Sequence, residues 1–211
     1  MGAGGTRDRI VEAGAGLFWR QGYTATGMKQ IVTEAEAPFG SVYHFFPGGK
    51  EELGAEVIRW SGAFYEQIVM TVLDGAPDIV TAMADAFAGA AETLRSSGYA
   101  DACPIATVAL EVSSTSEPIR QACAEVFDGW LTALAARFRA AGVDEATSRS
   151  LASTFLCLLE GAFILGRASR STQALEDAGR TMVAATEAAV RSGRGPAGSS
   201  RQRPMPRAGG R

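Results

Sequence analysis

Stretches with helical apolar spacing alternate along the chain with short runs rich in Gly, Pro, Ser and Asp. Apolar residues recur every three or four positions over most of residues 6–190, and runs of β-branched residues are few. No Asn-Gly or Asp-Gly pair lies between segments of strand-like alternation. Because this pattern is typical of amphipathic helices rather than hairpins, it predicts an all-α protein.

Helix breakers divide the first third of the chain into four predicted helices. Thr6 and Thr26 are placed as N-caps, Gly22 as a stop, and Pro38 as a first helical residue. The helices run from Thr6 to Gln21, from Thr26 to about Ala35, from Pro38 to the Pro47-Gly48-Gly49 breaker, and from Lys50 to about Leu73.

The remaining apolar pattern predicts five more helices, separated by Gly-, Ser- and Pro-containing connections. They cover residues 78–97, 104–112, 117–142, 145–169 and 172–190. The predicted order is a disordered start, a helix-turn-helix domain, a linking helix, a larger helical domain and a disordered basic tail. Their ranges are 1–5, 6–48, 49–73, 74–190 and 191–211.

The third helix is too short to be stable alone, so neighbouring elements must hold it. It nevertheless carries Ser41, Tyr43 and His44, whose polar ends suit contacts outside the protein, while Phe45 and Phe46 are expected to pack inward. A short helix of this kind, following a helix and a turn, predicts a DNA recognition helix.

Charge alone supports DNA binding only weakly. The net charge is −3, and residues 1–60 carry six basic and seven acidic side chains. Residues 61–190 carry eight basic and sixteen acidic side chains, and residues 191–211 carry six basic and no acidic ones. Since DNA binding usually draws on a basic surface, the prediction depends on the motif.

No catalytic, metal or cofactor site is predicted. His44 is the single histidine, the three cysteines lack zinc spacing, and no Walker or G-x-G-x-x-G motif is present. No N-terminal signal segment is evident, so a cytoplasmic protein with reduced thiols is expected. The most apolar window, 151–165, contains Glu160 and is shorter than the roughly 20 residues of a membrane span, so no membrane partner is expected.

Three segments together resemble the N-terminal domain of the TetR/AcrR family of bacterial regulators. They are Gly22-Tyr23-Thr24-Ala25-Thr26-Gly27-Met28-Lys29-Gln30-Ile31, Gly40-Ser41-Val42-Tyr43-His44-Phe45-Phe46 and Lys50-Glu51-Glu52-Leu53. The run Cys103-Pro104-Ile105-Ala106-Thr107-Val108-Ala109-Leu110-Glu111 and the Pro-Gly-Gly-Lys segment are similar to the LmrA/YxaF-like branch.

The resemblance implies about nine helices: three in a DNA-binding head, a linking fourth, and a ligand-binding body whose last two helices pair with a second subunit. It also implies contacts with a double-stranded DNA operator. The DNA-contact residues expected on this basis are Thr26, Lys29, Phe39, Gly40, Ser41, Tyr43, His44 and Lys50. Phe39 stands where such proteins commonly have Lys or Arg, and it could contact a thymine methyl group instead.

Apolar and aromatic side chains of the body could line a pocket for a small hydrophobic or aromatic effector, although residues at this spacing usually form core. The candidates are Phe64, Met83, Phe87, Cys103, Glu111, Trp130, Phe155 and Phe163. Redox sensing by Cys103 is disfavoured, because it follows Asp101 and no cation is near it in sequence.

The chain is therefore expected to be a ligand-responsive transcriptional regulator and not an enzyme. Surplus apolar positions on 145–169 and 172–190 predict a homodimer, which would place two recognition helices on a pseudo-palindromic operator. Repression is the favoured role and activation stays open, as do the effector, the operator and the role of the tail. The alternative is an all-α small-molecule binding protein or enzyme with a vestigial helix-turn-helix.

Overall fold

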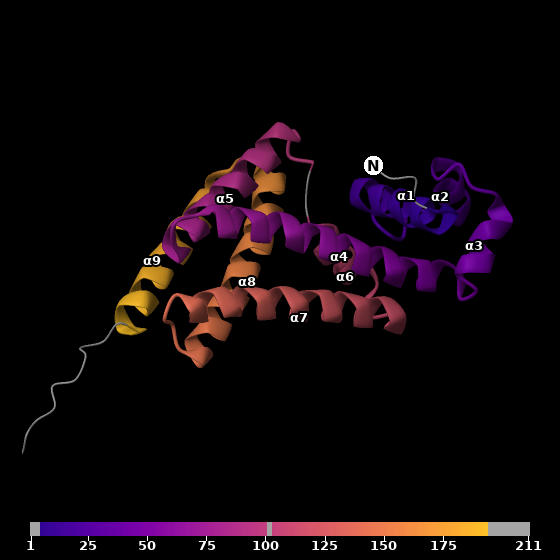
Figure 1. Cartoon of the computed structure of the whole chain (residues 1–211). Coiled ribbons are helices and arrows are strands. Elements are labelled where there is room, and N and C mark those ends of the chain that lie inside the picture. Colours follow the sequence, from indigo (N-terminus) through magenta and orange to yellow (C-terminus); the bar gives the residue numbers. More distant parts are fainter. Residues whose placement is uncertain (1–4, 101–102, 194–211) are drawn as a thin grey trace, which may run out of the picture.

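The computed structural model describes residues 5–100 and 103–193, whose regular secondary structure is entirely helical (Figure 1). The described part of the chain contains nine helices, which confirms the all-α prediction. They are α1 (Thr6–Gln21), α2 (Met28–Glu34), α3 (Phe39–Phe45), α4 (Gly49–Gly75), α5 (Ile79–Ser96), α6 (Pro104–Val112), α7 (Glu117–Ala140), α8 (Glu145–Ser169) and α9 (Gln173–Gly193).

The breakers place most helix ends within a residue or two of the predicted positions, and the ends of the chain differ more. Gly5, in the segment expected to be disordered, is the N-cap of α1. At the other end, α9 continues through Gly193, so residues 191–193 of the predicted tail are helical. Residues 1–4 and 194–211 lie outside the described part.

The two threonines predicted as N-caps do not cap their helices. Gly5 and Gly27 occupy the N-cap positions of α1 and α2. The Thr26 side chain is 1% exposed, and its hydroxyl donates to the Gly22 carbonyl at 2.7 Å. The capping prediction is wrong at Thr26 because this hydroxyl is used to close the connection between α1 and α2.

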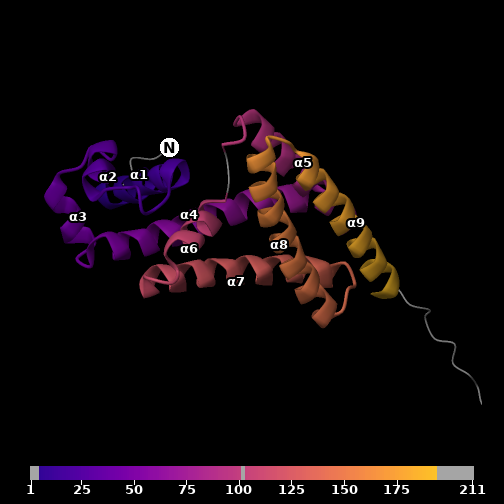
Figure 2. The same ribbon diagram turned by 180° about the vertical axis from the view of Figure 1, so that it is seen from behind.

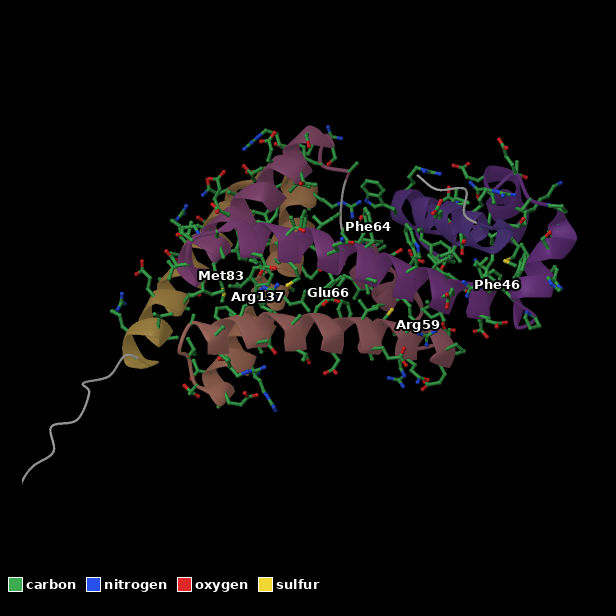
Figure 3. The ribbon with its side chains drawn as sticks, in the orientation of Figure 1. Phe46, Arg59, Phe64, Glu66, Met83 and Arg137 are labelled. Atoms are coloured by element: carbon green, nitrogen blue, oxygen red, sulfur yellow. The ribbon has the colours of Figure 1, made fainter. Side chains whose placement is uncertain are left out.

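Helix α4 runs from the head formed by α1–α3 into the body, with α7 alongside it (Figures 1 and 2). Its N-terminal part packs on α1, while α9 packs against α5 and α8 in the body. Two ion pairs join α4 to α7: Arg59 with Glu125 and Arg137 with Asp74, each at 2.8 Å. The two arginines lie toward opposite ends of this contact (Figure 3).

The buried side chains form two hydrophobic cores. The first joins the head, the first part of α4, α6 and the start of α7; its members include Phe18, Phe46, Leu53, Val108 and Ile119. The second fills the body and includes Met83, Leu94, Phe138 and Leu175. Since the first core includes residues of α6 and α7, the head is packed directly onto the body in addition to being linked through α4.

Among the described residues, α8 is long and apolar enough, by length and composition alone, to cross a membrane. Its contacts are those of a body helix, because it packs on both α7 and α9. Core helices of soluble proteins meet the same criterion.

Candidate nucleic-acid interface and ligand cleft

Helix α3 is held to the head by its apolar side. Pro38 at the N-cap has extended backbone (φ −60°, ψ 138°), and Phe46 is the C-cap that follows the last helical residue. The side chains of Val42 and Phe46 are 0% and 1% exposed, and the Arg7 guanidinium lies 5.4 Å from the Phe46 ring centroid. These contacts stabilise a helix of seven residues that could not persist alone.

The opposite side of α3 is open to solvent. Phe39 and Tyr43 are each half exposed, and their rings meet edge to face with centroids 5.7 Å apart. Gly40 and His44 are also exposed, and Ser41 is partly buried. This face therefore presents a hydroxyl, an imidazole and an aromatic edge together, which are groups able to contact base edges and phosphates.

The two lysines lie in different environments. Lys29 on α2 is exposed. Lys50 at the start of α4 is partly covered: its ammonium lies 4.2 Å from the Tyr23 ring centroid and 3.5 Å from the Thr24 carbonyl oxygen. Burial lowers the pKa of Lys50, and the negative charge of Glu111 acts in the opposite direction.

Thr26 differs from the other expected DNA-contact residues. Its side chain is buried and hydrogen-bonded inside the α1–α2 connection. The Thr26 hydroxyl is therefore used inside the fold, and the burial of this side chain does not support the DNA contact expected of it.

Carboxylates neutralise part of the head's positive charge. Arg7 pairs with Glu56 at 2.7 Å, and Arg20 pairs with Glu34 at 2.9 Å. Each pair is partly exposed, so its contribution to stability is small. The larger consequence of this pairing is that fewer positive charges of the head are available to the phosphates of a nucleic-acid backbone.

A cleft of about 330 Å³ opens between α6 and α8. One wall is the face of α6 formed at helical spacing by residues 103, 106, 107, 110 and 111, and the other comes from α8. The lining residues are Cys103, Ala106, Thr107, Leu110, Glu111, Glu160, Phe163, Ile164 and Arg167. Its walls combine apolar surface with two carboxylates, a guanidinium and a hydroxyl, a composition suited to a small, largely apolar ligand that carries polar groups.

The cleft contains an unusual neighbouring pair, Cys103 and Glu160. Burial raises the pKa of the Cys103 thiol, and the adjacent Glu160 carboxylate raises it further. Burial also raises the pKa of Glu160, while hydrogen bonding from Cys103 partly opposes that rise. A thiol in this setting stays protonated, which is unfavourable for an oxidant sensor.

The structure brings three of the eight predicted pocket residues, Cys103, Glu111 and Phe163, to this cleft. The other five lie elsewhere. Met83, Phe87 and Phe155 are buried in the second core, Phe64 is about half exposed on α4 and stacks on Trp60, and the Trp130 indole donates to the Gly62 carbonyl at 3.0 Å. Figure 3 shows Phe64 and Met83 at separate positions along the molecule.

Thr107, Glu160 and Arg167 line the cleft but were not identified from sequence. The sequence could have indicated a role for Glu160, since it is the one charged residue within the apolar window 151–165. A partly buried acid at such a position is costly and is often functional. The helical spacing of α6 could likewise have indicated Thr107, which lies one turn after Cys103.

Profiles of two protein families match the chain. Residues 10–57 match "Bacterial regulatory proteins, tetR family", and residues 79–181 match "Transcriptional regulator LmrA/YxaF-like, C-terminal domain". The first match covers the α3 face, and the second covers the cleft.

Two Bacillus subtilis regulators are similar over most of their length. The uncharacterized HTH-type transcriptional regulator YxaF is 34% identical over 162 residues, which cover 77% of this chain and 85% of YxaF. The HTH-type transcriptional regulator LmrA is 28% identical over 175 residues, covering 83% of this chain and 93% of LmrA.

Solved structures share the fold. A TetR transcriptional regulator from Legionella pneumophila superposes with a TM-score of 0.73 at 23% identity, covering 86% of this chain and 97% of the other. The reduced form of Escherichia coli NemR gives 0.70 at 23% identity, covering 84% and 95% of the two chains.

Proposed function

The chain belongs to the TetR family of bacterial regulatory proteins, and we propose that it is a homodimeric repressor released from its DNA operator when a small effector binds the α6–α8 cleft. Family membership makes it a helix-turn-helix transcriptional regulator rather than an enzyme. Repression, effector binding and operator release are the proposed refinements. Cytoplasmic location is proposed with them, because the regulated DNA is there.

The observation that carries the DNA-binding role is the division of α3 into an anchored side and an exposed side. Val42 and Phe46 hold the helix, while Tyr43 and His44 project from it. Such a helix enters the major groove without reorganising, so its side chains reach base edges at little entropic cost. Phe39 beside Tyr43 supports an apolar contact with a thymine methyl group.

Exposed apolar and small residues on the last two helices support the dimer. On α8, Cys157, Leu165 and Ala168 are exposed at helical spacing, and Leu165 is 62% exposed. On α9, Ala184 and Ala188 are exposed one turn apart. Small residues let two helices approach closely, and burying the leucine against a second copy is favourable. The two heads would then contact successive major grooves about 34–36 Å apart.

The effector is proposed to be small, largely apolar and equipped with hydrogen-bond donors. The cleft volume of about 330 Å³ lies at the lower end of ordinary ligand pockets. Leu110, Phe163 and Ile164 supply apolar surface, and the Glu111 and Glu160 carboxylates supply acceptors.

A gel shift with DNA flanking the protein's own coding region tests the function. Sequence-specific, salt-sensitive retardation is expected. Tyr43→Ala and His44→Ala should each lower the affinity of specific binding by roughly 100-fold, while the thermal midpoint stays close to that of the unchanged protein. Trp19→Ala, which removes an exposed aromatic side chain of the head outside α3, is the matched control.

Two outcomes would contradict the proposal. Absence of specific binding at low salt would favour a small-molecule binding protein with a vestigial head, which the near-neutral charge of residues 1–60 otherwise supports. Unfolding of the Tyr43 and His44 variants would assign both residues to the core of the head.

A further inference from the structure

Glu111 lies at the boundary between the cleft and the head. It belongs to the last turn of α6 and lines the cleft. Its carboxylate also accepts a hydrogen bond at 2.8 Å from the backbone N–H of Thr24, a residue 87 positions away in the α1–α2 connection. One side chain therefore contacts both the proposed effector site and the DNA-binding head.

The backbone at Gly22 is shaped to admit this carboxylate. Gly22 has φ +78° and ψ 173°, a conformation that L side chains rarely adopt. A Cβ at this position would collide with the Glu111 carboxylate. The absence of a side chain thus allows the α6 carboxylate to reach the turn after α1.

The contact continues to Lys50. The carbonyl oxygen of Thr24 lies 3.5 Å from the Lys50 ammonium, which also sits over the Tyr23 ring. Glu111 therefore holds the backbone N–H of Thr24. The carbonyl of the same residue faces Lys50, which is an expected phosphate contact. The Thr26 hydroxyl closes the same connection by donating to Gly22.

We propose that Glu111 is the positioning residue that transmits occupation of the cleft to the DNA-binding head, through Thr24 and Lys50. The inference rests on the proposed function, since it supplies the link between its two sites. A ligand donor that draws the Glu111 carboxylate into the cleft takes it from the Thr24 N–H. The α1–α2 connection and Lys50 then lose their fixed positions, and operator affinity falls.

Linkage makes the effect reciprocal. DNA that holds Lys50 and the α1–α2 connection in place strengthens the contact of Thr24 with Glu111, and so weakens ligand binding by the same factor. Couplings of this kind commonly span about 5- to 150-fold in affinity.

The first arm of the test compares variants of the full-length protein by fluorescence anisotropy with the flanking-DNA fragment. Glu111→Ala should weaken binding about tenfold, within the usual range of coupling. Glu111→Gln keeps an oxygen that accepts from the Thr24 N–H, and it should stay within about threefold of the unchanged protein. Glu92→Ala, which removes an exposed glutamate of α5 outside the cleft and the head, is the matched control and should have no effect on operator affinity.

The second arm fills the cleft without a ligand and needs no DNA. Ala106→Trp places an indole on the cleft wall, in the otherwise unchanged chain and together with Glu111→Ala. Hydrogen exchange of the amides of residues 22–27 is expected to accelerate on filling the cleft only when Glu111 is present. In Glu111→Ala alone these amides should already exchange faster, so the two changes are not additive.

Equal operator affinity for Glu111→Ala and Glu92→Ala would overturn the inference while leaving the proposed function intact. So would additive effects of Ala106→Trp and Glu111→Ala on exchange, or no effect of Ala106→Trp at all. If the unchanged protein binds no DNA, the proposed function fails by itself, and the exchange measurement still decides whether Glu111 links the cleft to the head.

Discussion

Helices α3 and α8 both expose large side chains, but of different kinds. On α3 the exposed groups are Tyr43, His44 and Phe39, set over a tightly buried side. On α8 the large exposed side chain outside the cleft is Leu165, accompanied by small residues such as Gly161 and Ala168. In the first set Tyr43 and His44 carry hydrogen-bonding ends, whereas the second set is apolar.

This difference indicates two kinds of partner. Rings with polar ends retain hydrogen bonds in a wet DNA groove, and about half or more of protein–DNA hydrogen bonds go to phosphate and sugar. Apolar and small residues gain most from a dry contact with another helix. Exposure alone would not separate the two surfaces; the chemistry of the exposed atoms does.

The largest expected effect comes from breaking the α8 surface with Leu165→Glu. A carboxylate buried at a helix–helix interface is strongly unfavourable, so we expect a monomer at micromolar concentration. Since two linked heads gain about 10²- to 10⁴-fold in avidity, operator affinity should fall by roughly 100-fold or more. Light scattering after size exclusion measures the first result, and anisotropy the second.

Leu110→Glu is the matched control for this change, because Leu110 is 79% exposed on α6 and lies outside α8 and α9. It should leave the dimer intact. Dissociation by both substitutions, or by neither, would contradict the assignment of the dimer interface to α8.

The second prediction disrupts the α3 surface by removing a buried side chain that supports the helix. Phe46→Ala removes a ring that is 1% exposed, and a large-to-small change of this type costs about 3–5 kcal/mol. The head should lose its fold at a lower denaturant concentration than the body. Specific DNA binding should then be lost together with stability, in contrast to Tyr43→Ala. Two-phase unfolding by circular dichroism is the measurement, and a single unshifted transition would contradict it.

The helix order could be predicted because strong breakers separate the elements. Pro38 and Pro47 enclose α3, and α6 has the predicted bounds, Pro104–Val112. The N-cap prediction for Thr26 was wrong because a threonine before an apolar run can form either of two hydrogen bonds. It can cap the next helix, or it can bond back into the preceding turn. The choice depends on tertiary contacts around Gly22, which the local pattern does not contain.

The cleft was less predictable for a related reason. Its walls come from α6 and α8, which are far apart in the sequence, and the aromatic spacing of a pocket wall is the same as that of a core. Met83, Phe87 and Phe155 therefore satisfied the same pattern as Phe163. Only packing distinguishes buried side chains that touch each other from side chains that face a cavity.

The third prediction sharpens the comparison by measuring how much of the DNA affinity comes from contacts between positive side chains and phosphates. Lys29 is exposed on α2, whereas Arg20 is paired with Glu34. Lys29→Ala should reduce the slope of log affinity against log salt by about 0.9, the value for one phosphate contact. Arg20→Ala should change the slope less, because its charge is already compensated. Equal changes would mean that the Arg20–Glu34 pair opens on DNA.

The smallest expected effect concerns the inner side of α8, where Glu160 faces the cleft. Burial raises the pKa of Glu160 above its ordinary value in the folded protein, so the folded state holds this proton more firmly than the unfolded state. The resulting stability is fully present below the ordinary value of 4.5 and is lost as pH rises through the folded-state pKa. The Glu160→Gln variant does not undergo that loss of stability. Its thermal midpoint should therefore increase relative to that of the unchanged protein as pH rises.

Glu117 provides a control of opposite sign for this measurement. It is exposed, and hydrogen bonding from Arg120 lowers its pKa. The stability that Glu117 contributes is therefore present above the ordinary pKa of a glutamate and is lost as pH falls through the folded-state pKa. The thermal midpoint of Glu117→Gln should decrease relative to that of the unchanged protein as pH rises. Thermal melts of both variants between about pH 2 and pH 8 give the two trends, because the lowered pKa of Glu117 changes stability at acidic pH and the raised pKa of Glu160 changes it at higher pH. A pH-independent difference for Glu160→Gln would mean that the Glu160 carboxyl group is solvated, and that the charge facing the cleft is available to a ligand without a desolvation cost.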